Sequence, residues 1–95
     1  MAVTGIRPQA DGSYIVEGKV TIRDINRELD WDLPDEDYST LAGLLLFESQ
    51  RIPAPGQVYV FHDYRFEVLK KQRNQIVSLR VIPPENVDDK RDTGT

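Results

Sequence analysis

The chain has 95 residues, a formal net charge of −4 and no cysteine. This length suits one small domain, and the acidic balance argues against nucleic-acid binding, which needs a concentrated basic face. The missing cysteines exclude disulfides and thiolate metal sites, and they favour a reducing compartment.

The first part of the chain predicts a linker followed by a strand. Residues 1–10 show no periodic pattern and contain the breakers Gly5 and Pro8, so we expect a flexible N-terminal linker that leads into a turn at residues 11–12. The chain shows no signal-peptide pattern at this end. Residues 13–20 then predict a strand, since tyrosine, isoleucine and valine favour extended backbone.

The next segment predicts a short helix. Thr21 and Asp24 have the spacing of a capping box, in which each side chain bonds to the other residue's backbone amide. Ile22, Ile25 and Leu29 follow on one helical face. The helix is expected to end before residues 30–34, because a proline disfavours helical geometry at the residue before it.

A second helix is expected from residue 38 or 39 to residue 49. Asp37 or Ser39 is the expected N-cap, and acidic residues there also face the positive end of the helix dipole. The apolar run in this helix, residues 41–47, is far shorter than the roughly 20 residues that span a bilayer. We therefore expect the chain itself to be soluble.

The last third predicts a three-stranded meander over residues 57–61, 64–72 and 75–82. A two-residue turn at residues 73–74 places Glu67 opposite Arg80 on a charged face and Val68 opposite Leu79 on an apolar face. Residues 84–95 predict a flexible, charged tail. The resulting β-α-α-β-β-β order predicts an α+β, two-layer fold with a mostly antiparallel sheet and both helices on one face.

The acidic residues before the second helix are the candidate metal ligands. Asp35 and Asp37 are carboxylates of the kind that Mg²⁺ and Ca²⁺ prefer. The glycine and distal glutamate of a calcium-binding loop are missing, and helix capping explains the same residues without a metal. Both interpretations stay open, with capping favoured.

The second helix is apolar nearly all round, which is typical of a helix covered on more than one side. Leu44, Leu46 and Phe47 are therefore the candidate interaction surface, for a second copy of the chain or another docking partner. Gly43 inside this helix indicates close packing against another backbone. A helix fully covered within the monomer is the equally weighted alternative.

Enzymatic function is not expected. The one histidine, His62, lies beside Asp63 at a predicted hairpin tip, which offers no pocket for catalysis. The glycines form no dinucleotide-binding or phosphate-loop pattern. No catalytic or cofactor-binding residue is therefore predicted.

Several strings together resemble a known family. They are DGSYIVEG at 11–18, IRDIN at 22–26, LPDEDYSTLAGL at 33–44, RIPAPG at 51–56 and FEVL at 66–69. In order and spacing they are similar to the transporter-associated CorC/HlyC domain, over residues 11–83. The chain departs from the family pattern at the tip formed by residues 62–63 and at the end of the second helix, residues 49–50.

The resemblance implies a non-enzymatic regulatory module of a bacterial membrane protein of the hemolysin or magnesium and cobalt efflux type. It implies CBS and transmembrane domains in the parent protein as partners, a homodimer, and a place on the cytoplasmic face of the inner membrane. The related fold of FAD-binding flavoproteins suggests flavin binding by analogy alone, and no flavin fingerprint is present. Regulation of ion transport is thus the expected function, with ligand or divalent-metal sensing by the acidic loop as the alternative.

Overall fold

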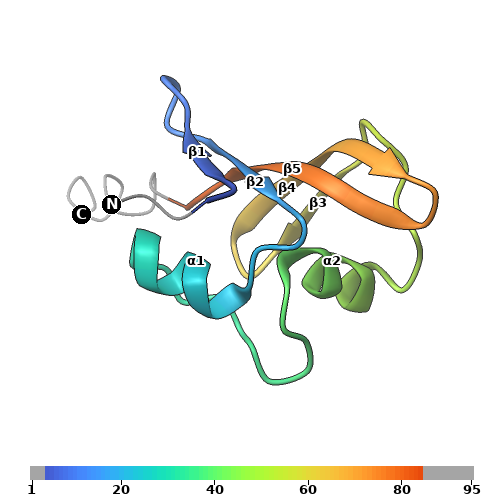
Figure 1. The fold of residues 1–95 in the computed structure, drawn as a ribbon, viewed down its shortest axis with the longest axis horizontal. Helices are drawn as coiled ribbons and strands as arrows, with labels where there is room; N and C mark the ends of the chain where they lie inside the picture. Colours follow the sequence, from blue (N-terminus) through green and yellow to red (C-terminus); the bar gives the residue numbers. More distant parts are fainter. Residues whose placement is uncertain (1–3, 85–95) are drawn as a thin grey trace.

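Alternating apolar and polar residues build an antiparallel sheet whose apolar face carries both helices (Figure 1). This computed structural model describes residues 4–84, and the expected flexible residues 1–3 and 85–95 lie outside the described part. The five-stranded sheet has the order β1-β2-β5-β4-β3. Its elements are β1 (Ile6–Pro8), β2 (Tyr14–Glu17), α1 (Ile22–Leu29), α2 (Leu41–Ser49), β3 (Val58–Phe61), β4 (Tyr64–Gln72) and β5 (Gln75–Ile82).

The expected α+β class and two-layer arrangement are confirmed, with one strand more than the sequence predicted. β1 lies inside the segment expected to be a linker and pairs with β2, Ile6 opposite Val16 and Pro8 opposite Tyr14. The prediction failed because three residues with a terminal proline give no alternation to detect. The expected turn at Asp11 and Gly12 is the connection of this hairpin, and there the Asp11 carboxylate accepts from the amide and hydroxyl of Ser13.

The predicted pairing of β4 with β5 is confirmed. Val68 lies opposite Leu79, and Glu67 lies opposite Arg80 with a 3.5 Å contact between their charged groups. The register shifts between Val68 and Lys70 and again between Lys70 and Lys71. The pairing returns to Gln72 opposite Gln75 at the tip. Across the shift the alternation of β5 changes, and Ile76 is buried in the core together with Leu79.

Both helices begin at one backbone junction. Thr21 and Thr40 form an isolated antiparallel bridge, and each is the N-cap of the helix that follows it. The Thr21 hydroxyl accepts from the Asp24 amide and the Thr40 hydroxyl accepts from the Gly43 amide, both at 3.1 Å. These caps satisfy amides that the helices leave unpaired.

The junction confirms one predicted cap and corrects the other. Thr21 caps α1 as expected, although the Asp24 carboxylate contacts Arg27 at 2.6 Å. The cap of α2 is Thr40, whereas Asp37 or Ser39 was expected. Ser39 supplies its carbonyl to the Ile22 amide at 2.7 Å instead, and this pairing of the two helix starts fixes the boundary.

The glycine that permits close packing is Gly18, and the expectation for Gly43 is wrong. A Cβ atom added at Gly18 would lie 2.1 Å from the carbonyl oxygen of Ile76 on β5 and 3.1 Å from the Cβ of Ala42. A Cβ at Gly43 would meet only the Thr40 hydroxyl and the Tyr38 Cβ, both at 3.3 Å. The close approach therefore lies between the start of α2 and the sheet.

The core fills the space between the sheet and the helices. One end of it is an aromatic cluster in which Trp31 contacts Tyr14 edge-on, with ring centroids 5.3 Å apart, and Tyr64 at 5.0 Å. The loop after α1 is held there because the Asn26 side chain exchanges hydrogen bonds with the Leu33 backbone. The fully buried side chains include Val16, Ile22, Ile25, Leu41, Leu44, Leu45, Phe66, Val68, Leu79 and Val81.

Candidate interaction surfaces

α2 is divided between the core and the surface. Leu41, Leu44 and Leu45 are fully buried against the sheet. Leu46 is half-buried, and Phe47 is 46% exposed. The sequence placed Leu44 on an interaction surface, and this is corrected, because Leu44 lies on the helical face that packs against the sheet. Only Leu46 and Phe47, the α2 patch, are left for a partner.

Phe47 packs against Tyr38 at the edge of the domain. The two ring centroids are 5.2 Å apart with an interplanar angle of 55°. Tyr38 comes from the loop that leads to α2, so the loop and the helix present the aromatic pair together. Ile52, after the helix, is also 45% exposed. An aromatic side chain of this size at the surface suits the centre of a protein contact.

A small hollow adjoins Leu46. It has a volume of about 300 Å³ and lies between the start of α2 and the tip of the β4–β5 hairpin. Its apolar walls are Gly18, Ala42, Leu46 and Ile76. The hollow exists because Gly18 and Ala42 have little or no side chain where the helix meets the sheet. Its size suits a single apolar side chain of a partner.

A hydrogen-bonded network adjoins the aromatic pair of Tyr38 and Phe47. The Tyr38 hydroxyl donates to Glu48 Oε2 at 3.3 Å, and His62 Nε2 lies 3.1 Å from the same oxygen. Burial and the Glu48 carboxylate raise the pKa of Tyr38 to about 12. The network ties the β3–β4 hairpin to α2. No sequence pattern predicts this network, because His62 and Glu48 are 14 residues apart and belong to no motif.

The tip between β3 and β4 is a two-residue turn. His62 has φ +56° and Asp63 has φ +72°, so both adopt the left-handed conformation of a type I′ hairpin. The departure from the family pattern therefore changes the residues of the turn without lengthening it. The side chain of His62 contacts Glu48, so the turn residue connects the hairpin tip with α2.

The acidic loop is solvated. Asp35 and Asp37 are exposed, and the Asp35 carboxylate lies 3.5 Å from the Arg23 guanidinium. Asp35 borders an open hollow of about 560 Å³, which Asp24, Arg23 and Arg27 also line. Within residues 4–84, no three histidine or acidic side chains gather as a metal-binding group. The metal site therefore stays a prediction.

The chain resembles parts of larger proteins. The transporter associated domain model of CorC/HlyC proteins matches residues 7–85. The inner membrane protein YfjD of Escherichia coli K12 is 35% identical over 78 residues, which cover 82% of this chain and 18% of that protein. The magnesium and cobalt efflux protein CorC of Vibrio cholerae is 29% identical, over 84% of this chain and 28% of that protein.

Solved structures share the fold over nearly their full length. A conserved protein of Haemophilus influenzae has a TM-score of 0.80 and 30% identity, covering 84% of this chain and 99% of that one. The transporter associated domain of a CBS domain protein from Porphyromonas gingivalis has a TM-score of 0.72 and 30% identity, covering 83% and 97%. A Xylella fastidiosa hemolysin domain in complex with Mg²⁺ and Mn²⁺ has a TM-score of 0.73 and 24% identity, covering 84% and 98%, and supports the fold alone.

The two sets of comparisons agree on what this chain is. The family model covers most of the chain, and the curated relatives extend well beyond the part that the chain matches. No helix among residues 4–84 is long and apolar enough to cross a membrane. With its five-stranded sheet and paired helices, the chain belongs to the CorC/HlyC family of transporter associated domains.

Proposed function

We propose that this chain is a non-enzymatic regulatory domain of a membrane-anchored CorC/HlyC-type protein and that it modulates the transport of divalent cations. Relatives named as an inner membrane protein and as a magnesium and cobalt efflux protein support the proposal. The matched region is 18% and 28% of these two proteins. We infer that its partners are other parts of the parent protein, the CBS and transmembrane domains, at the cytoplasmic face of the inner membrane.

The exposure of Phe47 carries this proposal. α2 already supplies Leu41, Leu44 and Leu45 to the core, and it still leaves a phenylalanine 46% exposed. Burying that ring against a partner removes more apolar area from water than any neighbouring position of the helix offers. The half-buried Leu46 and its adjoining hollow extend the same surface, so the α2 patch is the docking site for the parent protein.

The test uses the full-length protein that contains this chain. Deletion of the domain is expected to change the rate or the regulation of magnesium or cobalt efflux, measured with cation-loaded cells or vesicles. Phe47→Lys is expected to reproduce the effect of the deletion, and Arg65→Ala, at an exposed residue of β4, is the matched control. Unchanged transport in the deletion variant would refute regulation, and unchanged transport in Phe47→Lys alone would refute the α2 patch as the docking site.

Divalent-cation binding by Asp35 and Asp37 is the second candidate. The Xylella fastidiosa domain of the same fold was solved with Mg²⁺ and Mn²⁺, and the two carboxylates of this chain are open to solvent. Calorimetry with each cation, comparing the natural chain with a double Asp35→Asn, Asp37→Asn variant, tests the site. Equal heats for both proteins would remove it. Flavin binding rests on fold analogy alone, and an unchanged melting temperature with added FAD would exclude it.

A further inference from the structure

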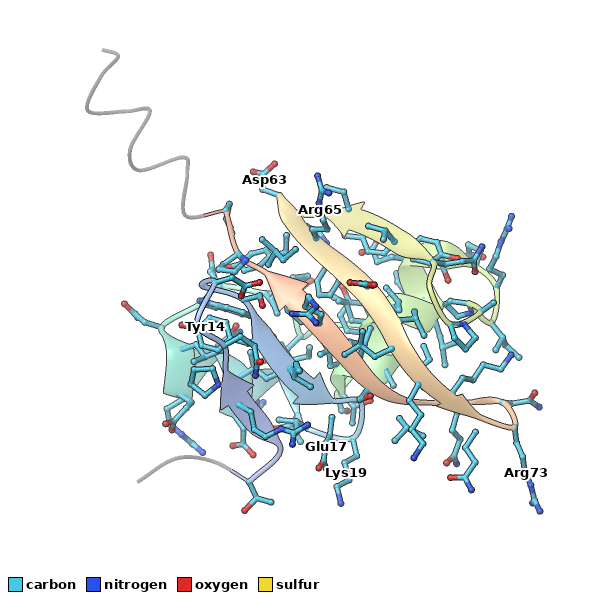
Figure 2. The ribbon with its side chains drawn as sticks, turned by 90° about the horizontal axis from the view of Figure 1, so that it is seen from above. Tyr14, Glu17, Lys19, Asp63, Arg65 and Arg73 are labelled. Atoms are coloured by element: carbon cyan, nitrogen blue, oxygen red, sulfur yellow. The ribbon has the colours of Figure 1, made fainter. Side chains whose placement is uncertain are left out.

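The two edges of the sheet differ in how they are protected. β1 has three residues and ends in Pro8, which cannot donate a backbone hydrogen bond to a new strand. β3 has four residues, no proline and no charged side chain. Natural sheets usually block an exposed edge with charge, proline or a bulge. Figure 2, which looks onto the outer face of the sheet, shows β3 at the edge away from β1.

The free backbone groups of β3 belong to its two valines. Phe61 pairs with Tyr64 across the two-residue turn, and Tyr59 pairs with Phe66. In an antiparallel ladder the bonded pairs alternate, so the amides and carbonyls of Val58 and Val60 point away from β4. Within residues 4–84, no further backbone or side-chain hydrogen bond is recorded for these groups. Among the large hydrophobic side chains of residues 4–84, those of Val58 and Val60 are the most exposed, at 49% and 60%.

We propose that β3 pairs with β3 of a second copy of this chain, which joins the two sheets edge to edge. A two-fold axis through Tyr59 sets Val58 opposite Val60 of the second copy and Val60 opposite Val58, with both outward amides and both outward carbonyls of each chain bonded. This edge is separate from the α2 patch, and its self-pairing does not depend on the proposed role in transport.

The charge pattern supports a second copy as the partner. Antiparallel pairing of identical strands brings like residues together, so any charge near the axis would face its own copy at a cost. Residues 54–61 carry no charged side chain, and β3 therefore meets itself without repulsion. The four valines of the two chains would form one apolar cluster on the outer face. A basic or acidic peptide would find no complementary charge along this strand.

The size of the interface sets its strength. A single pair of four-residue strands buries less than the roughly 1,200 Å² of a stable complex, so the isolated chains are expected to pair with a dissociation constant between about 0.1 and 1 mM. When two copies are held together in a larger assembly, the effective concentration reaches the millimolar range and the pairing becomes favourable.

Sedimentation velocity of the whole chain, from about 10 μM to about 1 mM, tests the proposal over the range where such an interface forms. The natural chain is expected to shift from monomer toward dimer. Val60→Lys, which adds a charge beside the axis, is expected to remain monomeric, and Val60→Thr is the control that keeps a strand-forming residue. Phe47→Lys is expected to dimerise like the natural chain. A monomer at the highest concentration, or equal dimerisation of Val60→Lys, would overturn the proposal.

A cross-linking experiment tests the register. The chain has no natural cysteine, and residues facing each other at a non-bonded antiparallel position lie about 4.5 Å apart between Cα atoms. Tyr59→Cys is therefore expected to form a disulfide-linked dimer at least tenfold faster than Val58→Cys, although Val58 is the more exposed position. Circular dichroism checks that each variant is folded. Equal cross-linking rates in folded variants would show random collision and overturn the register.

Discussion

α1 and α2 begin at the same junction and cover the same sheet face, but they divide their side chains differently. α1 buries Ile22 and Ile25 and turns Arg23 and Arg27 to solvent. α2 buries its leucines and still exposes Phe47. The packing of the domain alone accounts for every apolar residue of α1. α2 carries more apolar surface than the domain covers, and this difference supports the proposal that α2 also contacts a partner.

The largest effect is expected at Gly18, where the backbone packs closely against β5 and the start of α2. Gly18→Ala places a Cβ 2.1 Å from the Ile76 carbonyl oxygen, a backbone clash that the sheet cannot relieve. We expect a loss of more than about 4 kcal/mol of stability, a large part of the total for a small domain. Urea unfolding measures it. Gly43→Ala is the control, with an expected change within about 1 kcal/mol because helix propensity and crowding oppose each other.

The division within α2 predicts unequal costs for neighbouring truncations. Leu44→Ala is expected to cost about 3 kcal/mol, since Leu44 is fully buried. Phe47→Ala is expected to cost less than about 1 kcal/mol, because nearly half of the ring is already in water. Thermal unfolding of both variants measures the difference. Equal costs would mean that Phe47 belongs to the core and is not available to a partner.

The shared junction predicts similar costs for both caps. Thr21→Ala and Thr40→Ala each remove a hydroxyl that accepts from a helix amide at 3.1 Å. Each is expected to cost about 1 kcal/mol, and Thr→Ser at either position should restore most of it. Because the two residues contact each other through the bridge, the double variant is expected to deviate from additivity. Strict additivity in chemical unfolding would argue that the two helix starts are independent.

Alkaline pH is expected to lower the stability of the fold through the ionisation of Tyr38, which packs against α2. Burial and Glu48 raise the pKa of Tyr38 to about 12, whereas an unfolded tyrosine ionises near pH 10. The folded state therefore holds the Tyr38 proton more tightly than the unfolded state does. The resulting stabilisation of the fold is fully present below about pH 10 and is lost as the pH rises toward 12. Tyr38→Phe is expected to flatten this decline, by no more than about 1 kcal/mol after solvent screening. An unchanged pH profile in denaturant titrations would contradict it.

Local patterns predicted most of the fold. The alternation in residues 64–72 and 75–82 gave the pairing of Glu67 with Arg80, because a two-residue turn leaves a single register that keeps both faces. Thr21 was found from its spacing to Asp24, since a cap is a local interaction. β1 could not be predicted, because a strand of three residues shows no alternating pattern. It is recognised as a strand only from its pairing with β2.

The candidate surfaces were predictable only in part. Phe47 was identified from the excess of apolar residues in its helix, but the sequence could not tell which leucines face the sheet, because every helical face is apolar. Leu44 was misplaced for that reason. Gly18 and the Glu48 network depend on contacts between distant segments. The free edge at β3 likewise appears only when the strand order is known.

The aromatic cluster around Trp31 makes the domain its own optical reporter. The chain has a single tryptophan, and its ring contacts Tyr14 on β2 and Tyr64 on β4. Its fluorescence therefore reports the docking of the loop after α1, with no second indole to confuse the signal. β3 and the α2 patch contain no tryptophan, so variants there leave the reporter intact. One emission spectrum can thus certify the fold of every variant before its association is measured.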